Sequence, residues 1–521
     1  MSTIKSSTTL TTAYSVEADT TGALVIQTGA TPTTALTISS AQVVTFANPP
    51  TATGGGSLAT NTAYGTNALA ATNTGGFSVG VGQNAGAANT SGQITAVGNS
   101  ALITNTTGSQ NTAVGISSMY ANTTGGFNTA IGVGSLAANT TQNYNTAVGY
   151  QSANVNTTGQ ITAVGALSLA ANTTGTNNVA VGIEALKANT TAASNTAVGY
   201  QTLLTNTTGT NNTGVGQSAL GLNTTGSYNS AFGLQALANN TTGQQQVSVG
   251  RNSLSLNTTG SYNTACGHDA LSQNTTASNN TAVGYQTLRD SVTGTQNAGF
   301  GAFTLQASTS SNNAGFGYGA LASQTSGGSN SAIGYTAGTT ITTGTNNICF
   351  GQAAGGVLTT GSSNIFIGSG NNNASAAGVS NEILICTGNQ TGKGASTGFI
   401  QPNGGGVFQG NNSSTWSTTS DQRLKKNIVD NTDGLSKITG IRVRNFEYRI
   451  AEEITDLPQN QAIDKQGVQL GVIAQELQTV LPDCVKTEST GVMSVDTDNL
   501  IWYLVNSIKE LKAEIDALKG A

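Results

Sequence analysis

Few side chains before residue 420 could carry chemistry. The chain has a single histidine, His268, so a catalytic triad with a histidine elsewhere in the sequence is excluded. His268 follows a repeat glycine at a position whose residue type varies between repeats, which favours a packing or surface role. Glycoside hydrolysis needs two carboxylates roughly 5 to 10 Å apart. The acids of the repeats are isolated in the sequence, and we therefore expect no glycan-hydrolysing centre there; they are Glu184, Asp269, Asp290 and Glu382.

The cysteines show no spacing typical of a metal site. Two of them replace apolar residues of the repeat, so we expect buried free thiols and not disulfides. The sequence predicts neither a metal nor a cofactor. The four cysteines are Cys266, Cys349, Cys386 and Cys484.

A denser group of reactive side chains begins at Ser420, in the segment Ser-Asp-Gln-Arg-Leu-Lys-Lys-Asn-Ile. Arg423, Lys425 and Lys426 could be the solvated basic edge of a strand. Alternatively, a lysine that burial keeps neutral can deprotonate a serine hydroxyl, which is a weak nucleophile at its free pKa. The spacing alone leaves both interpretations open.

Charge divides the chain into two parts of different structure. Only 11 charged residues precede Ser420, whereas 28 lie in Asp421–Ala521. Glycine accounts for 68 of the 521 residues, far from ordinary globular usage. The net charge is −5 and the basic residues before Ser420 are scattered, which argues against nucleic-acid binding. Without a signal-peptide pattern or a run of 18 apolar residues, we expect neither secretion nor membrane insertion.

A repeat of 16 or 17 residues occupies Asn61–Gly368. Its core is Asn-Thr-Ala-Val-Gly, as in Asn111–Gly115, and a leucine recurs four residues after the glycine. A turn, Asn-Thr-Thr-Gly, lies between the cores, and its Asn and Gly suit positive φ while stacked Asn side chains can bond backbone amides of neighbouring coils. One unit cannot bury a core alone, so about nineteen units must stack with their valines and leucines in continuous apolar columns. At ~4.8 Å per coil the shaft extends ~90 Å.

These repeats resemble the head of YadA-like trimeric autotransporter adhesins, whose coils carry a similar Asn-Ser-Val-Ala-Ile-Gly core. The resemblance implies a mainly β fold, an elongated left-handed parallel β-roll or β-helix that trimerises through its apolar columns. Two apolar columns make a small core, which independently favours an oligomer.

The C-terminal part ends in a helix with an apolar seam. Residues along it alternate by three and four through about three heptads. Isoleucine at a with leucine at d by itself favours two strands, so this seam does not predict a trimer. The seam residues are Ile501, Leu504, Ile508, Leu511, Ile515 and Leu518.

Three features together, Ser-Asp-x-Arg-x-Lys-Lys, Gly-Val-Ile-Ala-Gln-Glu-Leu at Gly471–Leu477 and the terminal coiled coil, resemble the intramolecular chaperone domain of phage tail fibres, tailspikes and endosialidases. The resemblance covers residues 415–521. It implies a domain that trimerises the fibre, after which a serine–lysine dyad cuts the chain once. By this resemblance Ser420 is the nucleophile, Lys425 the general base and Thr419–Ser420 the cleaved bond, with no turnover activity.

We therefore expect four parts: a strand-rich attachment region at 1–50, a β-roll shaft at 51–368, a distal tip or linker at 369–419 and an α+β chaperone domain at 420–521. This organisation predicts a homotrimeric phage tail fibre, made in the host cytoplasm and carried on the virion tail. Its N-terminus would bind the baseplate or other tail proteins, and its distal end a host-surface glycan or protein receptor.

Two alternatives remain open. A bacterial trimeric surface adhesin would need a signal peptide and a membrane anchor, and a polysaccharide-depolymerising tailspike would need paired carboxylates. Tyrosines that follow repeat glycines could stack on sugars or simply pack; they are Tyr150, Tyr200, Tyr285, Tyr318 and Tyr335.

Overall fold

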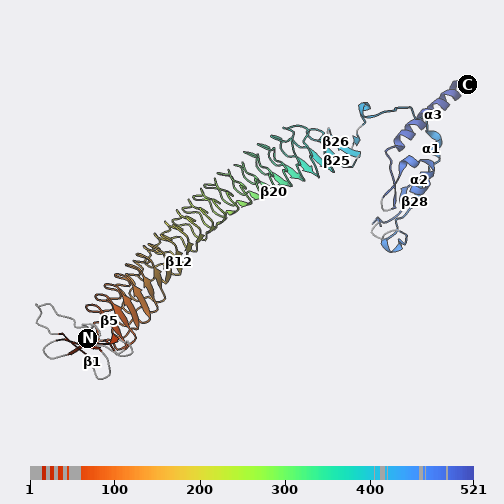
Figure 1. Ribbon diagram of the computed structural model, residues 1–521. Coiled ribbons are helices and arrows are strands. Elements are labelled where there is room, and N and C mark those ends of the chain that lie inside the picture. The colour runs from red at the N-terminus through yellow and green to blue at the C-terminus, as the bar shows by residue number, and fades with distance from the viewer. Residues whose placement is uncertain are drawn as a thin grey trace. The chain divides into compact units, whose positions relative to one another are not determined.

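The computed structural model divides into two compact units, Met1–Thr419 and Ser420–Ala521, which are described separately (Figure 1). Four short strands are described near the N-terminus. The other described residues are 60–403, 405–410, 417–418, 420–456, 462–463, 465–488 and 491–520.

The four N-terminal strands form an antiparallel sheet in the order β1-β2-β3-β4. They all fall in the predicted attachment region, whose other residues lie outside the described part. The strands are β1 (Tyr14–Ala18), β2 (Leu24–Thr28), β3 (Thr33–Ile38) and β4 (Val44–Thr45).

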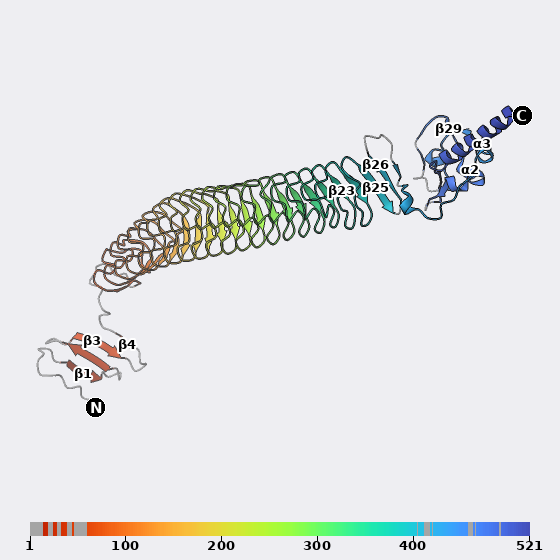
Figure 2. The same cartoon turned by 90° about the horizontal axis from the view of Figure 1, so that it is seen from above.

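The shaft is a parallel β-solenoid in which one short strand of each coil pairs with the strands of the coils before and after it. Figures 1 and 2 show these coils stacked in sequence order. The predicted mainly β fold with a tandem-repeat solenoid is confirmed. The strands are β5 (Thr62–Tyr64), β6 (Val79–Val81), β7 (Ile94–Val97), β8 (Asn111–Val114), β9 (Thr129–Ile131), β10 (Thr146–Val148), β11 (Ile161–Val164), β12 (Asn178–Val181), β13 (Thr196–Val198), β14 (Thr213–Val215), β15 (Ser230–Phe232), β16 (Val247–Val249), β17 (Thr264–Cys266), β18 (Thr281–Val283), β19 (Ala298–Phe300), β20 (Ala314–Phe316), β21 (Ser331–Ile333), β22 (Ile348–Phe350), β23 (Ile365–Ile367) and β24 (Ile383–Cys386).

The core inside the coils consists of alanine and leucine columns. Strand residues pair in register, so that Ala163 lies opposite Ala180, and both are fully buried, as is Leu186. The valine column is different, because Val181 is 37% exposed. Since successive strand residues point to opposite faces, the alanine points inward and the valine outward. The prediction of a buried leucine column is confirmed, and that of a buried valine column is wrong.

Positive φ occurs at the corners of each coil. It is 136° at Gly182 and Gly199, and 51° at Leu186 and 53° at Leu203. The Asn-Thr-Thr-Gly turn at 206–209, where we expected it, has no residue with positive φ. Positive φ also occurs two residues after the glycine, at Glu184 (59°) and Gln201 (54°), and ahead of the strand, at Ser194 (60°) and Asn211 (58°).

Two buried asparagine ladders run along the shaft. In the turn ladder, Asn223 donates to Asn206 Oδ1 at 2.8 Å and to the carbonyl of Gly226 at 2.9 Å. In the ladder at the strand starts, Asn195 Oδ1 accepts the backbone N–H of Asn212 at 2.9 Å. The expected bond from an Asn side chain to the next coil's amide is thus made at the strand start. Both ladders satisfy polar groups that would otherwise be buried without partners.

Turn glycines are required by the close approach of adjacent coils. A Cβ built at Gly159 would overlap the carbonyl oxygen of Gly175 and lie 2.6 Å from Asn156 Oδ1 and 2.9 Å from Asn172 Nδ2. The neighbouring coil and the asparagine ladder fill this space, so even a methyl group must displace backbone.

We expect Gly159→Ala to destabilise the shaft by about 1–3 kcal/mol, the usual range for overpacking. Thr158→Ala, at an exposed position of the same turn, is the matched control and should change little. Thermal unfolding followed by far-UV circular dichroism measures both. Equal midpoints for the two variants would contradict the close approach of the coils.

The parallel ladder continues past Gly368 into the segment predicted as a distal tip. Strand β24 pairs in parallel with β25 (Gly398–Asn403). The ladder then changes direction, because β26 (Gly405–Gln409) is antiparallel to β25 and β27 (Ser417–Thr418) is antiparallel to β26. Figure 2 shows β25 and β26 at this end of the stack.

The second unit is a small α+β assembly with two antiparallel strand pairs, β28–β29 and β30–β31. Leu477, Leu481 and Cys484 are its buried centre. Its elements are the 3-10 turns η1 (Gln422–Leu424), η2 (Ala451–Glu453) and η4 (Pro482–Cys484), the helices α1 (Leu435–Thr439), α2 (Ala474–Val480) and α3 (Leu500–Gly520), and the strands β28 (Arg444–Phe446), β29 (Gln469–Gly471), β30 (Val485–Thr487) and β31 (Met493–Val495). The predicted C-terminal helix is confirmed.

All four cysteines are free thiols. Cys349, Cys386 and Cys484 are buried, and burial raises the pKa of the Cys349 thiol to about 12. Cys266 is exposed because it occupies the outward-facing valine position of its strand. The prediction of burial is therefore wrong for Cys266.

Candidate functional site

The serine and the lysine singled out in the sequence lie together at the start of the second unit. Asp421 caps the 3-10 turn η1, and Lys425 ends it, with its backbone N–H donating to the carbonyl of Gln422 at 3.1 Å. This single turn brings the side chain of Lys425 close to that of Ser420, and Lys425 Nζ donates a hydrogen bond to Ser420 Oγ at 2.6 Å. The arrangement pairs a nucleophilic hydroxyl with an amine within proton-transfer distance.

Asp421 and Arg423 hold the turn in shape. The Asp421 carboxylate accepts the backbone N–H of Arg423 at 2.8 Å, and its Oδ2 accepts from the Arg423 guanidinium at 2.6 Å. These bonds hold the pKa of Asp421 below its usual value and raise that of Arg423. Sequence reasoning missed the role of Asp421, although an aspartate two residues before an arginine at a turn start is a capping signal.

Both members of the pair are exposed in the single chain. Ser420, Lys425 and Lys426 are all solvent-accessible, so the burial that would keep the lysine neutral is absent here. The segment is not a strand edge, because it forms a turn. Thr419, on the other side of the predicted cleavage point, lies outside the described residues.

Helix α3 is fixed to its own unit by one side. The Asn506 side chain donates to the carbonyls of Asn431 at 2.8 Å and Asp433 at 3.0 Å, and Glu510 accepts the N–H of Leu435 at 2.7 Å. The predicted coiled-coil seam remains exposed; its residues are exposed by 56% at Ile501, 42% at Leu504, 66% at Ile508, 42% at Leu511, 46% at Ile515 and 80% at Leu518. A seam of this kind needs another helix to cover it.

A forked ion pair joins β28 to helix α2. Arg444 Nε and Nη2 donate to the Glu476 carboxylate at 3.1 and 2.7 Å. The bonds from Arg444 lower the pKa of Glu476. Because the folded-state pKa lies below the unfolded value, the pair stabilises the unit above the unfolded pKa and this contribution is lost as pH falls.

We expect the second unit to lose stability as the pH decreases from about 5 through the carboxylate range. Glu476→Gln should remove part of this dependence, because glutamine does not titrate. Denaturant unfolding of the full chain at several pH values measures it, followed by the fluorescence of Trp502 in a background in which the other tryptophan is replaced, Trp416→Phe. An identical pH dependence in the variant would show that this pair does not contribute.

The other candidate residues of the shaft have structural partners. Glu184 pairs with Lys187 at 2.6 Å, and Asp290 with Arg289 at 2.8 Å. Glu382 is fully buried at the end of the strand-start asparagine ladder, where its carboxylate accepts backbone N–H groups. The donors are Ser375 at 3.0 Å and Gly394 at 2.7 Å.

The described residues include neither a metal-binding cluster nor a membrane-spanning helix. Among them, no group of three or more His, Cys, Asp or Glu side chains could hold a metal ion. No helix in the same part of the chain is long and apolar enough to cross a membrane.

Residues 420–486 match the model of a peptidase family described as chaperone of endosialidase. The match begins at Ser420, the residue at which the second unit begins. Neither the curated proteins nor the solved structures contain a match to the chain. The chain thus combines a β-solenoid shaft with a C-terminal segment similar to the chaperone of endosialidase.

Proposed function

We propose that this protein is a phage tail fibre, a homotrimeric virion component that attaches the particle to its host cell. The observation that carries the proposal is the match of residues 420–486 to the chaperone of endosialidase directly after a long β-solenoid. A domain of that type implies trimerisation of the shaft that precedes it. Identical coils could pair one step out of line, and a C-terminal nucleus would fix their register.

Two exposed apolar surfaces support assembly from several copies. One is the seam of helix α3. The other, here named the outer stripe, is the residue before each repeat glycine, which is exposed in many coils although it is Val, Ile or Phe. Its exposed members include Ile131, Val181, Val198, Phe232, Val249, Phe300, Phe316, Ile333 and Phe350. Contact between copies would remove both surfaces from water.

The C-terminal unit then releases itself by one cut between Thr419 and Ser420. Neutral Lys425 takes the proton of Ser420 Oγ, and the oxygen attacks the carbonyl carbon of Thr419. The C–N bond breaks, the amine of Ser420 receives the proton from Lys425, and water hydrolyses the resulting ester. Because burial favours a neutral lysine and Lys425 is exposed in the single chain, cutting follows assembly, when other copies cover the dyad.

Attachment to the particle is assigned to residues 1–50, through the baseplate or other tail proteins, and host contact to the part of the fibre far from that end. The fibre is made in the host cytoplasm and carried on the virion tail. A polysaccharide-depolymerising tailspike is disfavoured, because Glu184, Asp290 and Glu382 are engaged by cations or backbone amides.

Immunogold electron microscopy tests this proposal. Antibodies against residues 60–403 should place gold on the tails of phage particles. Gold on the surface of uninfected bacteria would instead identify a bacterial adhesin and overturn the proposal.

A further inference from the structure

A row of aromatic side chains, here named the aromatic strip, runs along five neighbouring coils. It consists of His268, Tyr285, Phe303, Tyr318 and Tyr335, with one ring in each coil. Successive ring centroids lie 5.5, 5.2, 5.6 and 5.4 Å apart. Each ring contacts the next, so the strip is continuous.

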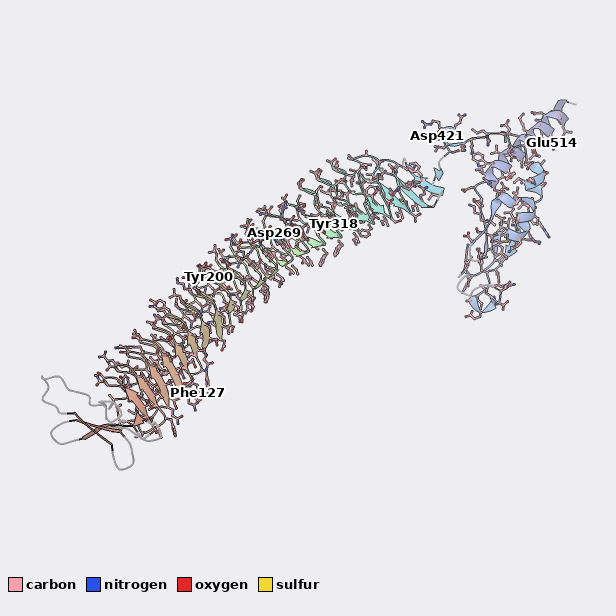
Figure 3. The ribbon with its side chains drawn as sticks, in the orientation of Figure 1. Phe127, Tyr200, Asp269, Tyr318, Asp421 and Glu514 are labelled. Atoms are coloured by element: carbon pink, nitrogen blue, oxygen red, sulfur yellow. The ribbon has the colours of Figure 1, made fainter. Side chains whose placement is uncertain are left out.

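The strip faces solvent although it is rich in aromatic surface. Tyr285 is 45% exposed, Tyr318 49% and Tyr335 57%. Figure 3 labels Tyr318 and also Asp269, which follows the first residue of the strip, His268, in the chain. Tyrosine combines an apolar ring with a polar hydroxyl, which suits a ligand that is apolar on one face and polar at its edges.

Fixed polar groups stand beside the rings. Asp269 accepts from Asn252 at 3.1 Å and lies 3.2 Å from the ring nitrogen of His268. Gln286, next to Tyr285 in the chain, accepts from Gln306 at 3.1 Å and from Arg289 at 3.3 Å. The strip is therefore bordered by carboxylate and amide groups whose positions are set by their own hydrogen bonds.

We propose that the aromatic strip binds an extended, uncharged stretch of a host-surface glycan, which lies along the shaft. Sugar rings present apolar C–H faces that stack on aromatic rings, while their hydroxyls bond to the neighbouring Asp269, Gln286 and Gln306. The inference rests on the attachment function proposed above and names its receptor class and site. An anionic sugar is not favoured here, because Asp290 binds the Arg289 guanidinium through two hydrogen bonds of 2.8 Å.

The extent of the strip distinguishes a glycan from a second copy of the chain. The outer stripe, on the other side of the repeat glycine in sequence, recurs in almost every coil, as contact between identical shafts requires. The aromatic strip stops after five coils, since the corresponding positions before and after it are Arg251 and Gln352. A local surface of this size fits a ligand of a few sugar units.

The test compares two pairs of exposed rings: Tyr285 and Tyr318, which both contact Phe303, and Phe127 and Tyr144, which contact each other. Tyr285→Ala combined with Tyr318→Ala interrupts the strip. Phe127→Ala combined with Tyr144→Ala removes a stacked pair with centroids 5.1 Å apart elsewhere on the shaft. Full-length wild type and both variants are applied to an array of bacterial capsular and O-antigen polysaccharides, and the affinity for each bound glycan is measured by calorimetry. Circular dichroism and native mass spectrometry establish that fold and copy number are unchanged.

We expect the wild type to bind at least one glycan, the strip variant to lose about tenfold or more in affinity and the control pair to bind like the wild type. Equal binding by the strip variant would overturn the inference, as would a change in its copy number, which would make the strip an interface between chains. A wild type that binds no glycan on the array yet adsorbs to host cells in a protease-sensitive manner would overturn the glycan inference alone. In that case the attachment function would stand.

Discussion

We expect Ser420→Ala to leave the chain at its full length of 521 residues, whereas the wild type should yield a fragment that begins at Ser420. The hydroxyl is the attacking group and alanine supplies none, so cutting stops. Lys425→Ala keeps the hydroxyl but removes the base that lies 2.6 Å away, and we expect it to slow cutting by about 10²–10⁴-fold. Gel electrophoresis with mass spectrometry of the fragments measures both.

Lys426→Ala is the matched control for the dyad. This lysine is adjacent, exposed and has no role in the proposed reaction, so cutting should proceed at the wild-type rate. A fragment beginning at Ser420 in the Ser420→Ala variant would contradict the assignment of the nucleophile. Equal cutting rates in the Lys425→Ala and Lys426→Ala variants would show that Lys425 is part of a basic surface and not the general base.

We expect charges placed in the α3 seam to abolish assembly. Ile508 and Leu511 are exposed in the single chain, so the double substitution Ile508→Asp with Leu511→Asp leaves the fold of the unit intact. In a coiled coil, however, it would bury six carboxylates among three helices without cations, which costs several kcal/mol. We expect monomeric, uncut chains, because the dyad is then never covered.

Lys509→Glu is the control for this seam variant. Lys509 is exposed on α3 and follows the seam residue Ile508 at heptad position b, away from the a, d, e and g positions, so its substitution changes charge outside the interface. Analytical ultracentrifugation gives the copy number of each variant. Trimers formed by the seam variant would show that α3 does not drive association.

The repeat made much of the shaft predictable. A constant step of 16 or 17 residues requires parallel pairing in register, and the leucine column is buried as expected. Which face of the strand points inward was not predictable from the pattern. In Thr-Ala-Val both Ala and Val are apolar, and only the narrow interior of the coil selects the smaller side chain, leaving Val181 outside and Ala180 inside.

The candidate site, like the shaft, has features that the sequence predicts and features that it does not. Resemblance named Ser420 and Lys425, and the 3-10 turn brings them together. The exposure of Lys425 could not be predicted, because burial in an assembly depends on chains that a single sequence does not describe. The cap formed by Asp421 was not predicted, because the basic residues that follow it suggested the edge of a strand and not the turn that Asp421 caps.

Native mass spectrometry of the purified wild-type protein is the most direct test of a fibre that assembles and then cuts itself. We expect a particle that holds three shafts, each ending at Thr419, together with separate or still-bound fragments that begin at Ser420. A stable monomer of the intact 52.0-kDa chain would contradict both the trimer and the role of the C-terminal unit.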